Sequence, residues 1–119
     1  MSPARPPRGL RDLEDLNDVF EALAHHTRRT ILVVLHARGD EMTSGAIASR
    51  FECAWPTVTR HLRVLEDAGL VSVGLRGRER IYSLNRDRLL AVAGAWLERF
   101  AHNMVQNARP ARRSRTRTR

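Results

Sequence analysis

The sequence predicts a mainly α-helical domain with one small β-hairpin. Apolar residues recur at helical spacing in several segments between residues 10 and 108, whereas residues 70–84 alternate apolar and polar side chains around glycine. A chain of 119 residues is expected to form a single domain. Residues 1–9 and 109–119 are rich in proline or arginine and are expected to be disordered tails, which leaves residues 10–108 as the folded part.

The first half of this domain contains three predicted helices. The first covers residues 10–24, where the apolar stripe includes Leu23. Thr27 is the expected N-cap of a second helix over residues 28–37, which ends at Gly39. A short third helix is expected to be capped by Thr43 or Ser44, and residues 52–54 form the turn into a fourth.

The segment from Trp55 to Tyr82 carries the functional prediction. A helix over residues 55–68 has Val58, Leu62 and Leu65 on one apolar face, so a polar face is left to meet a partner. Gly69 ends this helix, and two short strands follow with the basic turn 76–79 between them. A helix followed by a basic hairpin is typical of a winged helix-turn-helix, in which the helix enters the DNA major groove and the hairpin follows the backbone or an adjacent minor groove.

The candidate DNA contacts are the polar and aromatic side chains of these segments. They are Thr43, Ser44, Trp55, Thr57, Thr59, Arg60, His61, Arg63, Arg76, Arg78 and Arg80. The first residues of the 55–68 helix are expected to contact base edges, because recognition helices enter the groove by their N-terminal end. The hairpin arginines are expected to contact the backbone. Base contacts from the helix and backbone contacts from the hairpin together predict sequence-specific binding of double-stranded DNA.

The charge distribution supports a local DNA-binding surface. The net charge is +8, but the excess arginines lie in residues 1–9 and 109–119, while residues 10–108 hold equal numbers of arginine and acidic residues. Within that neutral part, the first helix is acidic and residues 76–88 are basic. This segregation favours a DNA-facing side, and the terminal arginines are expected to add only non-specific affinity.

Two terminal apolar stripes predict a homodimer. A last helix over residues 86–107 is expected to pair with the first helix to form a two-fold interface, although both stripes could instead pack within one chain. A dimer would read the two half-sites of a palindromic operator. The candidate interface residues are Leu13, Leu16, Val19 and Phe20 in the first helix, with Leu89, Ala93, Trp96, Leu97, Phe100 and Met104 in the last.

Three motifs resemble the ArsR/SmtB family of winged helix-turn-helix repressors. ALAHHTRRTILVVL (Ala22–Leu35) looks like the family's opening segment, PTVTRHLRVLEDAGLV (Pro56–Val71) is similar to its recognition-helix signature, and GRERIYSLN (Gly77–Asn85) resembles the second strand of its wing. His26 replaces a usual proline, and Thr59 a usual serine. The resemblance covers about residues 12–105 and implies a homodimeric DNA-binding repressor whose dimer is built from the first and last helices.

The sequence also argues against other functions. Thr43–Arg50 lacks the cysteine pair of metal-sensing relatives, and we expect no metal site and no cofactor. A metal- or thiol-responsive derepressor of the same family is the alternative. Cys53 is the candidate thiol, although no second cysteine is present to resolve an oxidised thiol. No nucleophile motif, phosphate loop or metalloprotease motif indicates an enzyme. A winged helix used only for protein contacts remains a weaker alternative, because it would not need a basic hairpin.

The expected location is the cytoplasm. The single cysteine fits a reducing compartment, and the N-terminal segment lacks the apolar core of a signal peptide. No apolar run is long enough to span a membrane. The expected partners are therefore an operator DNA and a second copy of the chain, and the effector that would release the DNA is left unassigned.

Overall fold

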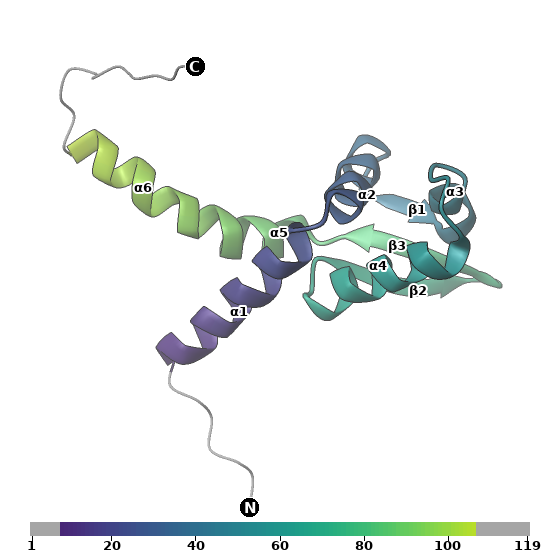
Figure 1. Cartoon of the computed structure of the whole chain (residues 1–119), viewed down its shortest axis with the longest axis horizontal. Helices are drawn as coiled ribbons and strands as arrows, with labels where there is room; N and C mark the ends of the chain where they lie inside the picture. The colour runs from purple at the N-terminus through teal and green to yellow at the C-terminus, as the bar shows by residue number, and fades with distance from the viewer. Residues whose placement is uncertain (1–7, 107–119) are drawn as a thin grey trace, which may run out of the picture.

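A computed structural model describes the backbone of residues 8–106 and the side chains of residues 12–101. The elements follow in the order α1 (Arg8–Leu23), α2 (His26–Ala37), β1 (Glu41–Thr43), α3 (Ser44–Ala48), α4 (Trp55–Asp67), β2 (Val71–Arg76), β3 (Glu79–Leu84), α5 (Arg86–Leu89), the π-helical segment η1 (Leu90–Gly94) and α6 (Ala95–Gln106). Figure 1 shows a body built from α2, α3, α4 and the sheet, from which α1 and α6 project as two arms. The mainly helical class with a β-hairpin is confirmed.

The β-hairpin is part of a three-stranded antiparallel sheet in the order β1-β3-β2. Strand β1 is the element that the sequence did not predict. It pairs Glu41 with Ser83 and Thr43 with Ile81 along β3. Because β1 has only three residues, it shows no alternation that a pattern search could detect, and its pairing with β3 defines it.

The core lies between the sheet and the helices around it. Ile31 and Leu35 of α2, Leu62 and Leu65 of α4, and Leu70 before β2 are at most 1% exposed. The apolar face predicted for the fourth helix is therefore the face that packs into the core, which leaves its other side free. Gly69 has a φ of +79° at the end of α4, the left-handed conformation in which glycine commonly terminates a helix.

Two predicted details of the helices are wrong. The N-cap of α2 is His25, whose Nδ1 accepts a hydrogen bond from the Thr27 N–H at 3.1 Å, so Thr27 lies inside the helix. The last helix is interrupted by η1, whose wider turn changes the phase of the apolar stripe. A periodicity search assumes a constant helical repeat and does not detect such a turn.

Replacing Thr43 with alanine is expected to destabilise the fold by about 1 kcal/mol, because an N-cap side chain is lost. The Thr43 hydroxyl accepts a hydrogen bond from the Ala46 N–H at 3.0 Å, which fixes the start of α3. Urea unfolding of Thr43→Ala measures this loss, and Thr43→Ser should keep most of the stability. Equal stability of the alanine variant and the wild type would show that the cap contributes nothing.

Candidate nucleic-acid interface

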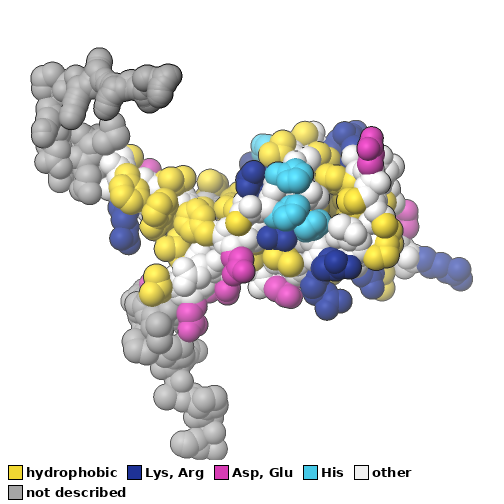
Figure 2. Space-filling model, in the orientation of Figure 1, with side chains coloured by type: hydrophobic (Ala, Val, Ile, Leu, Met, Phe, Trp, Pro, Cys, Tyr) yellow, Lys and Arg dark blue, Asp and Glu magenta, His cyan; other side chains and the backbone are white. Residues whose placement is uncertain are grey.

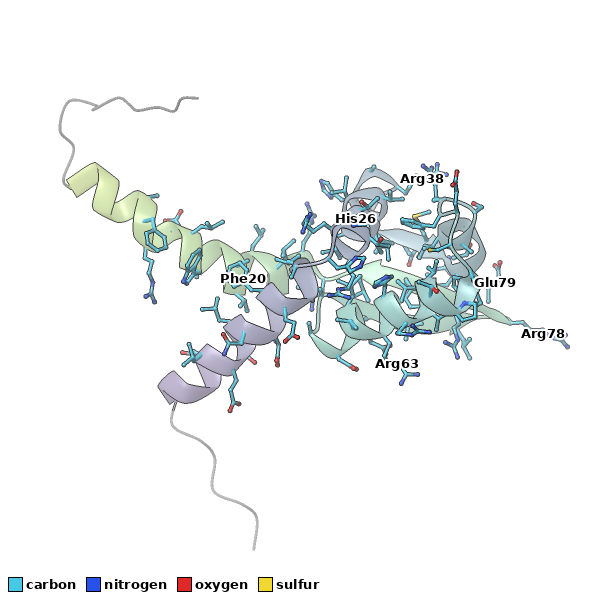
Figure 3. All side chains as sticks on the ribbon, in the orientation of Figure 1. Phe20, His26, Arg38, Arg63, Arg78 and Glu79 are labelled. Carbon is cyan, nitrogen blue, oxygen red and sulfur yellow. The ribbon has the colours of Figure 1, made fainter. Side chains whose placement is uncertain are left out.

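The outer face of α4 presents arginine to solvent. Val58, Leu62 and Leu65 hold the helix against the core, so Arg60 and Arg63 point away from it and are exposed. Figure 3 shows the labelled Arg63 side chain extending outward from α4. Trp55, the first residue of the helix, is 40% exposed, and Pro56 follows it within the first turn. The N-terminal end of α4 is therefore accessible, as a helix entering a DNA groove requires.

The hairpin of β2 and β3 forms a wing beside α4. Gly77 has a φ of +64° at its turn, and Figure 3 shows Arg78 at the tip, away from the body. Arg80 lies opposite Leu75 across the hairpin, and both are exposed. Arg76 instead donates from its guanidinium to the Glu41 carboxylate at 3.1 Å, so it also ties the wing to β1.

A hollow of about 490 Å³ lies between α4 and the wing. Arg63 lines it from the helix and Arg80 from the wing, while Glu66 and Asp67 also contribute. The space-filling view shows arginine side chains gathered over α4 and at the wing tip (Figure 2). Each wall therefore carries one arginine, and within the hollow the two carboxylates of α4 balance these charges.

Besides Arg76, three of the predicted DNA contacts are buried or bonded within the chain. The Thr59 hydroxyl oxygen is buried, so it is not presented for a DNA contact. Thr43 caps α3 with its hydroxyl. His61 has its Nδ1 at 3.2 Å from the Arg28 guanidinium of α2. Thr57 and Ser44 are half-buried, and the remaining candidates, Trp55, Arg60, Arg63, Arg76, Arg78 and Arg80, are exposed.

The basic region after the wing is used for intramolecular contacts. Arg88 donates to the Ala68 carbonyl at 3.1 Å and pairs with Asp15 of α1 at 3.4 Å, so it joins the end of α4 to the first helix. Arg86 pairs with Asp40 at 3.3 Å. The sequence showed that the acidic first helix and the basic region differ in charge, but not that the two are in contact.

The arms formed by α1 and α6 expose apolar side chains. Leu13, Leu97 and Phe100 are 52%, 58% and 50% exposed, and Figure 2 shows apolar side chains along α6. Leu16, Phe20, Leu89 and Trp96 are half-buried, and Trp96 packs edge-on against Phe20 with ring centroids 5.2 Å apart.

Two predicted interface residues are corrected by this packing. Val19 is fully buried and Ala93 is 7% exposed, because both belong to the core of the chain itself. The side chain of Met104 lies outside the described residues.

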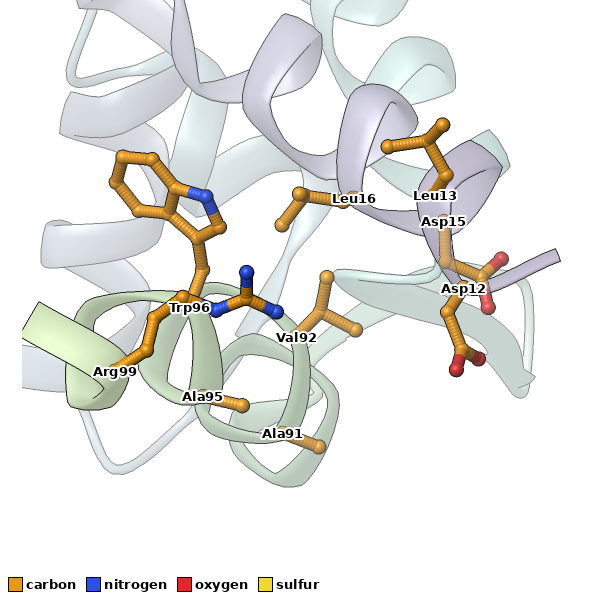
Figure 4. A pocket seen from close by; sticks show the side chains of 9 residues that line it. All are labelled: Asp12, Leu13, Asp15, Leu16, Ala91, Val92, Ala95, Trp96 and Arg99. Atoms are coloured by element: carbon orange, nitrogen blue, oxygen red, sulfur yellow. The ribbon is translucent and has the colours of Figure 1, made fainter. Parts of the chain in front are cut away.

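A second hollow, of about 570 Å³, lies between α1 and the C-terminal helices. Leu13, Leu16, Val92 and Trp96 give it an apolar lining, with Asp12, Asp15 and Arg99 also present (Figure 4). We call this hollow, together with the exposed side chains of Leu13, Leu97 and Phe100 on the two arms, the arm face.

The described part of the chain contains one exposed thiol but neither a cluster of metal ligands nor a membrane-spanning helix. Among these residues, no three His, Cys, Asp or Glu side chains converge as a metal site would require. Cys53 is exposed in the turn before α4. No helix in the described range is long and apolar enough to cross a membrane.

Comparison with known proteins gives consistent results. Residues 23–74 match a family model described as a helix-turn-helix domain. The chain is 40% identical over 70 residues to the transcriptional repressor SdpR of Bacillus subtilis, covering 59% of this chain and 76% of that protein. It is 31% identical to the HTH-type transcriptional repressor SmtB of Mycobacterium tuberculosis, covering 84% and 69% respectively. A crystal structure of an ArsR family transcriptional regulator superposes with a TM-score of 0.67 at 32% identity, covering 81% of this chain and 94% of that one.

Proposed function

The chain belongs to the ArsR/SmtB family of winged helix-turn-helix transcriptional regulators, and we propose that it represses transcription as a homodimer on a palindromic operator. As a member of this family it is a DNA-binding transcriptional regulator and not an enzyme. We further place it in the cytoplasm, where a regulator has access to the genome.

The observation that carries the DNA-binding proposal is that exposed arginines lie both on the outer face of α4 and on the wing beside it. Arg60 and Arg63 lie on the exposed face of the helix, and Arg78 and Arg80 on the wing. With α4 in a major groove, the phosphate backbone would pass between helix and wing, and Arg78 would reach the adjacent groove. Trp55 and Arg60 are assigned to base edges, while Arg63, Arg78 and Arg80 are assigned to phosphates.

The homodimer proposal is supported by the arm face. Leu13, Leu97 and Phe100 expose half or more of their surfaces on two helices that project from the body (Figure 1). Several large apolar side chains left exposed on neighbouring elements are typical of an interaction site. A two-fold copy packed there would cover it and would place two α4 helices for two half-sites about one DNA turn apart.

A selection of duplexes from a random 30-base-pair library tests the function. We expect enriched duplexes to share an inverted repeat and to bind at least about 1,000-fold more tightly than scrambled duplexes at physiological salt. Fluorescence anisotropy with a labelled enriched duplex gives the dissociation constants. Enrichment of single half-sites would contradict the palindromic operator, and equal affinity for enriched and scrambled duplexes would contradict sequence-specific recognition.

A further inference from the structure

A cluster of three histidines lies where α1, α2 and α4 meet. His25 stacks on His26 with ring centroids 5.0 Å apart, and its ring lies 4.4 Å from that of His61 on the recognition helix. In Figure 2 the histidine side chains gather in one patch on the visible face, and Figure 3 labels His26 there. A role in contacting DNA does not explain why these three histidine rings lie against one another.

Arg28 connects the cluster to all three helices. Its Nε donates to the Ala22 carbonyl at 2.8 Å, one terminal nitrogen donates to the Glu21 carbonyl at 3.2 Å, and the other lies 3.2 Å from His61 Nδ1. Arginine has only donors, so His61 Nδ1 must accept and cannot carry a proton. The contact that holds α4 against α2 through Arg28 therefore requires a neutral imidazole at His61.

His25 is held in the same protonation state by a different bond. Its Nδ1 accepts the hydrogen bond from the Thr27 N–H at 3.1 Å that caps α2. A protonated Nδ1 would face a donor, and the cap would be lost. Protonation of either ring thus removes a contact at the junction that positions the recognition helix.

The surroundings of the cluster contain both signs of charge. Asp18 and Glu21 of α1 and Asp67 of α4 line a hollow together with Arg28, while Arg29 of α2 and Arg60 of α4 add positive charge. Burial, His25 and Arg28 lower the pKa of His61 from its usual value of 6.5. Burial, followed by Arg28 and His26, lowers the pKa of His25.

We propose that His61, through Arg28 and together with His25, is a positioning residue for the recognition helix that makes operator binding sensitive to acid. Both rings are neutral in the DNA-binding arrangement. Protonation separates His61 from Arg28 and uncaps α2, so α4 loses its support on that side. The inference rests on the proposed DNA-binding function and adds a condition under which binding fails.

The direction of the pH effect is set by the lowered pKa values of the folded state. As the pH falls below about 6.5, His25 and His61 take up protons in the unfolded chain before they do so in the folded chain. The folding stability that these two neutral histidines contribute above pH 6.5 is therefore lost progressively. Protonated histidines at an ordinary DNA surface have the opposite effect, because added positive charge strengthens binding to phosphates. The sign of the change therefore distinguishes a positioning role from a DNA contact.

The test compares the affinity for an enriched duplex at pH 7.5 and pH 5.5, at constant ionic strength. Wild-type protein is expected to bind the enriched duplex several-fold more weakly at pH 5.5 than at pH 7.5, because the contacts of neutral His61 and His25 are lost on protonation. His61→Gln, which offers Arg28 a non-titrating amide oxygen, and His25→Asn, which keeps a capping oxygen, should each lose much of this dependence. His36→Gln is the control, because His36 lies at the opposite end of α2 beside Asp40.

Thermal unfolding of the same four proteins between pH 5.5 and pH 7.5 provides a readout without DNA. The midpoint of the wild type and of His36→Gln should fall at acid pH more steeply than that of His61→Gln. Unchanged or tighter operator binding by the wild type at pH 5.5 would overturn the inference while leaving the repressor function intact, as would full pH dependence in both cluster variants. Absence of operator binding at pH 7.5 would overturn the function and the inference together.

Discussion

Replacing Leu97 with aspartate is expected to dissociate the homodimer and weaken operator binding by at least about 100-fold, since one carboxylate would be buried on each side of an apolar contact. Leu97 is 58% exposed on α6, away from α4 and the wing, so the substitution removes no proposed DNA contact. A monomer engages one half-site and loses the high effective concentration that the linked second half-site provides. Light scattering at micromolar concentration measures the oligomeric state, and anisotropy measures the affinity.

The control for this substitution is Val33→Asp. Val33 is 67% exposed on α2, so aspartate at this position tests the effect of an added carboxylate away from the arm face. We expect this variant to remain dimeric and to bind the operator nearly as the wild type does. A Leu97→Asp protein that stays dimeric and binds with wild-type affinity would place the dimer interface elsewhere.

The parts of the fold that the sequence predicted are those set by local pattern. The spacing of Val58, Leu62 and Leu65 identified both the α4 helix and its buried face, because helical periodicity is a property of neighbouring residues. The same local information gave Gly69 as the end of α4 and the glycine-bearing turn of the wing. Residues with exposed side chains on that helix, such as Arg60 and Arg63, could therefore be named as candidates before the structure was known.

The features that the sequence did not predict depend on contacts between distant segments. Arg28 and His61 are 33 residues apart, and only the packing of α2 against α4 reveals that they meet. In the sequence, Arg88 is one of several basic residues in and after the hairpin. In the structure it bonds to the end of α4 and to Asp15. In the same way Thr59 has the chemistry of a DNA contact, but its hydroxyl is buried.

Polar residues on the recognition helix fall into those that face outward and those that hold the helix in place, and sequence periodicity separates only the apolar face from the rest. His61 and Arg60 are adjacent in sequence, yet one contacts Arg28 and the other is exposed to solvent. Substitutions at the two positions are therefore expected to impair DNA binding in different ways.

Arg60→Ala is expected to relax sequence preference, whereas Arg78→Ala is expected to weaken binding to all duplexes alike. A bidentate contact from Arg60 to a guanine contributes about 1–3 kcal/mol of discrimination, so its loss should reduce affinity for the enriched duplex by roughly 5- to 150-fold. Scrambled DNA offers no such contact and should be affected much less. Arg78 lies at the wing tip, where it would neutralise a phosphate whatever the sequence.

Salt titrations separate the two roles independently of affinity. Removing one phosphate contact should reduce the slope of log affinity against log salt by about one unit for Arg78→Ala. Arg60→Ala should leave most of that slope, because a base contact releases few condensed counterions. Equal losses on enriched and scrambled duplexes for Arg60→Ala would reassign Arg60 to the backbone. The base-reading role would then have to be assigned to other exposed residues of α4, with Trp55 at its N-terminal end the first candidate.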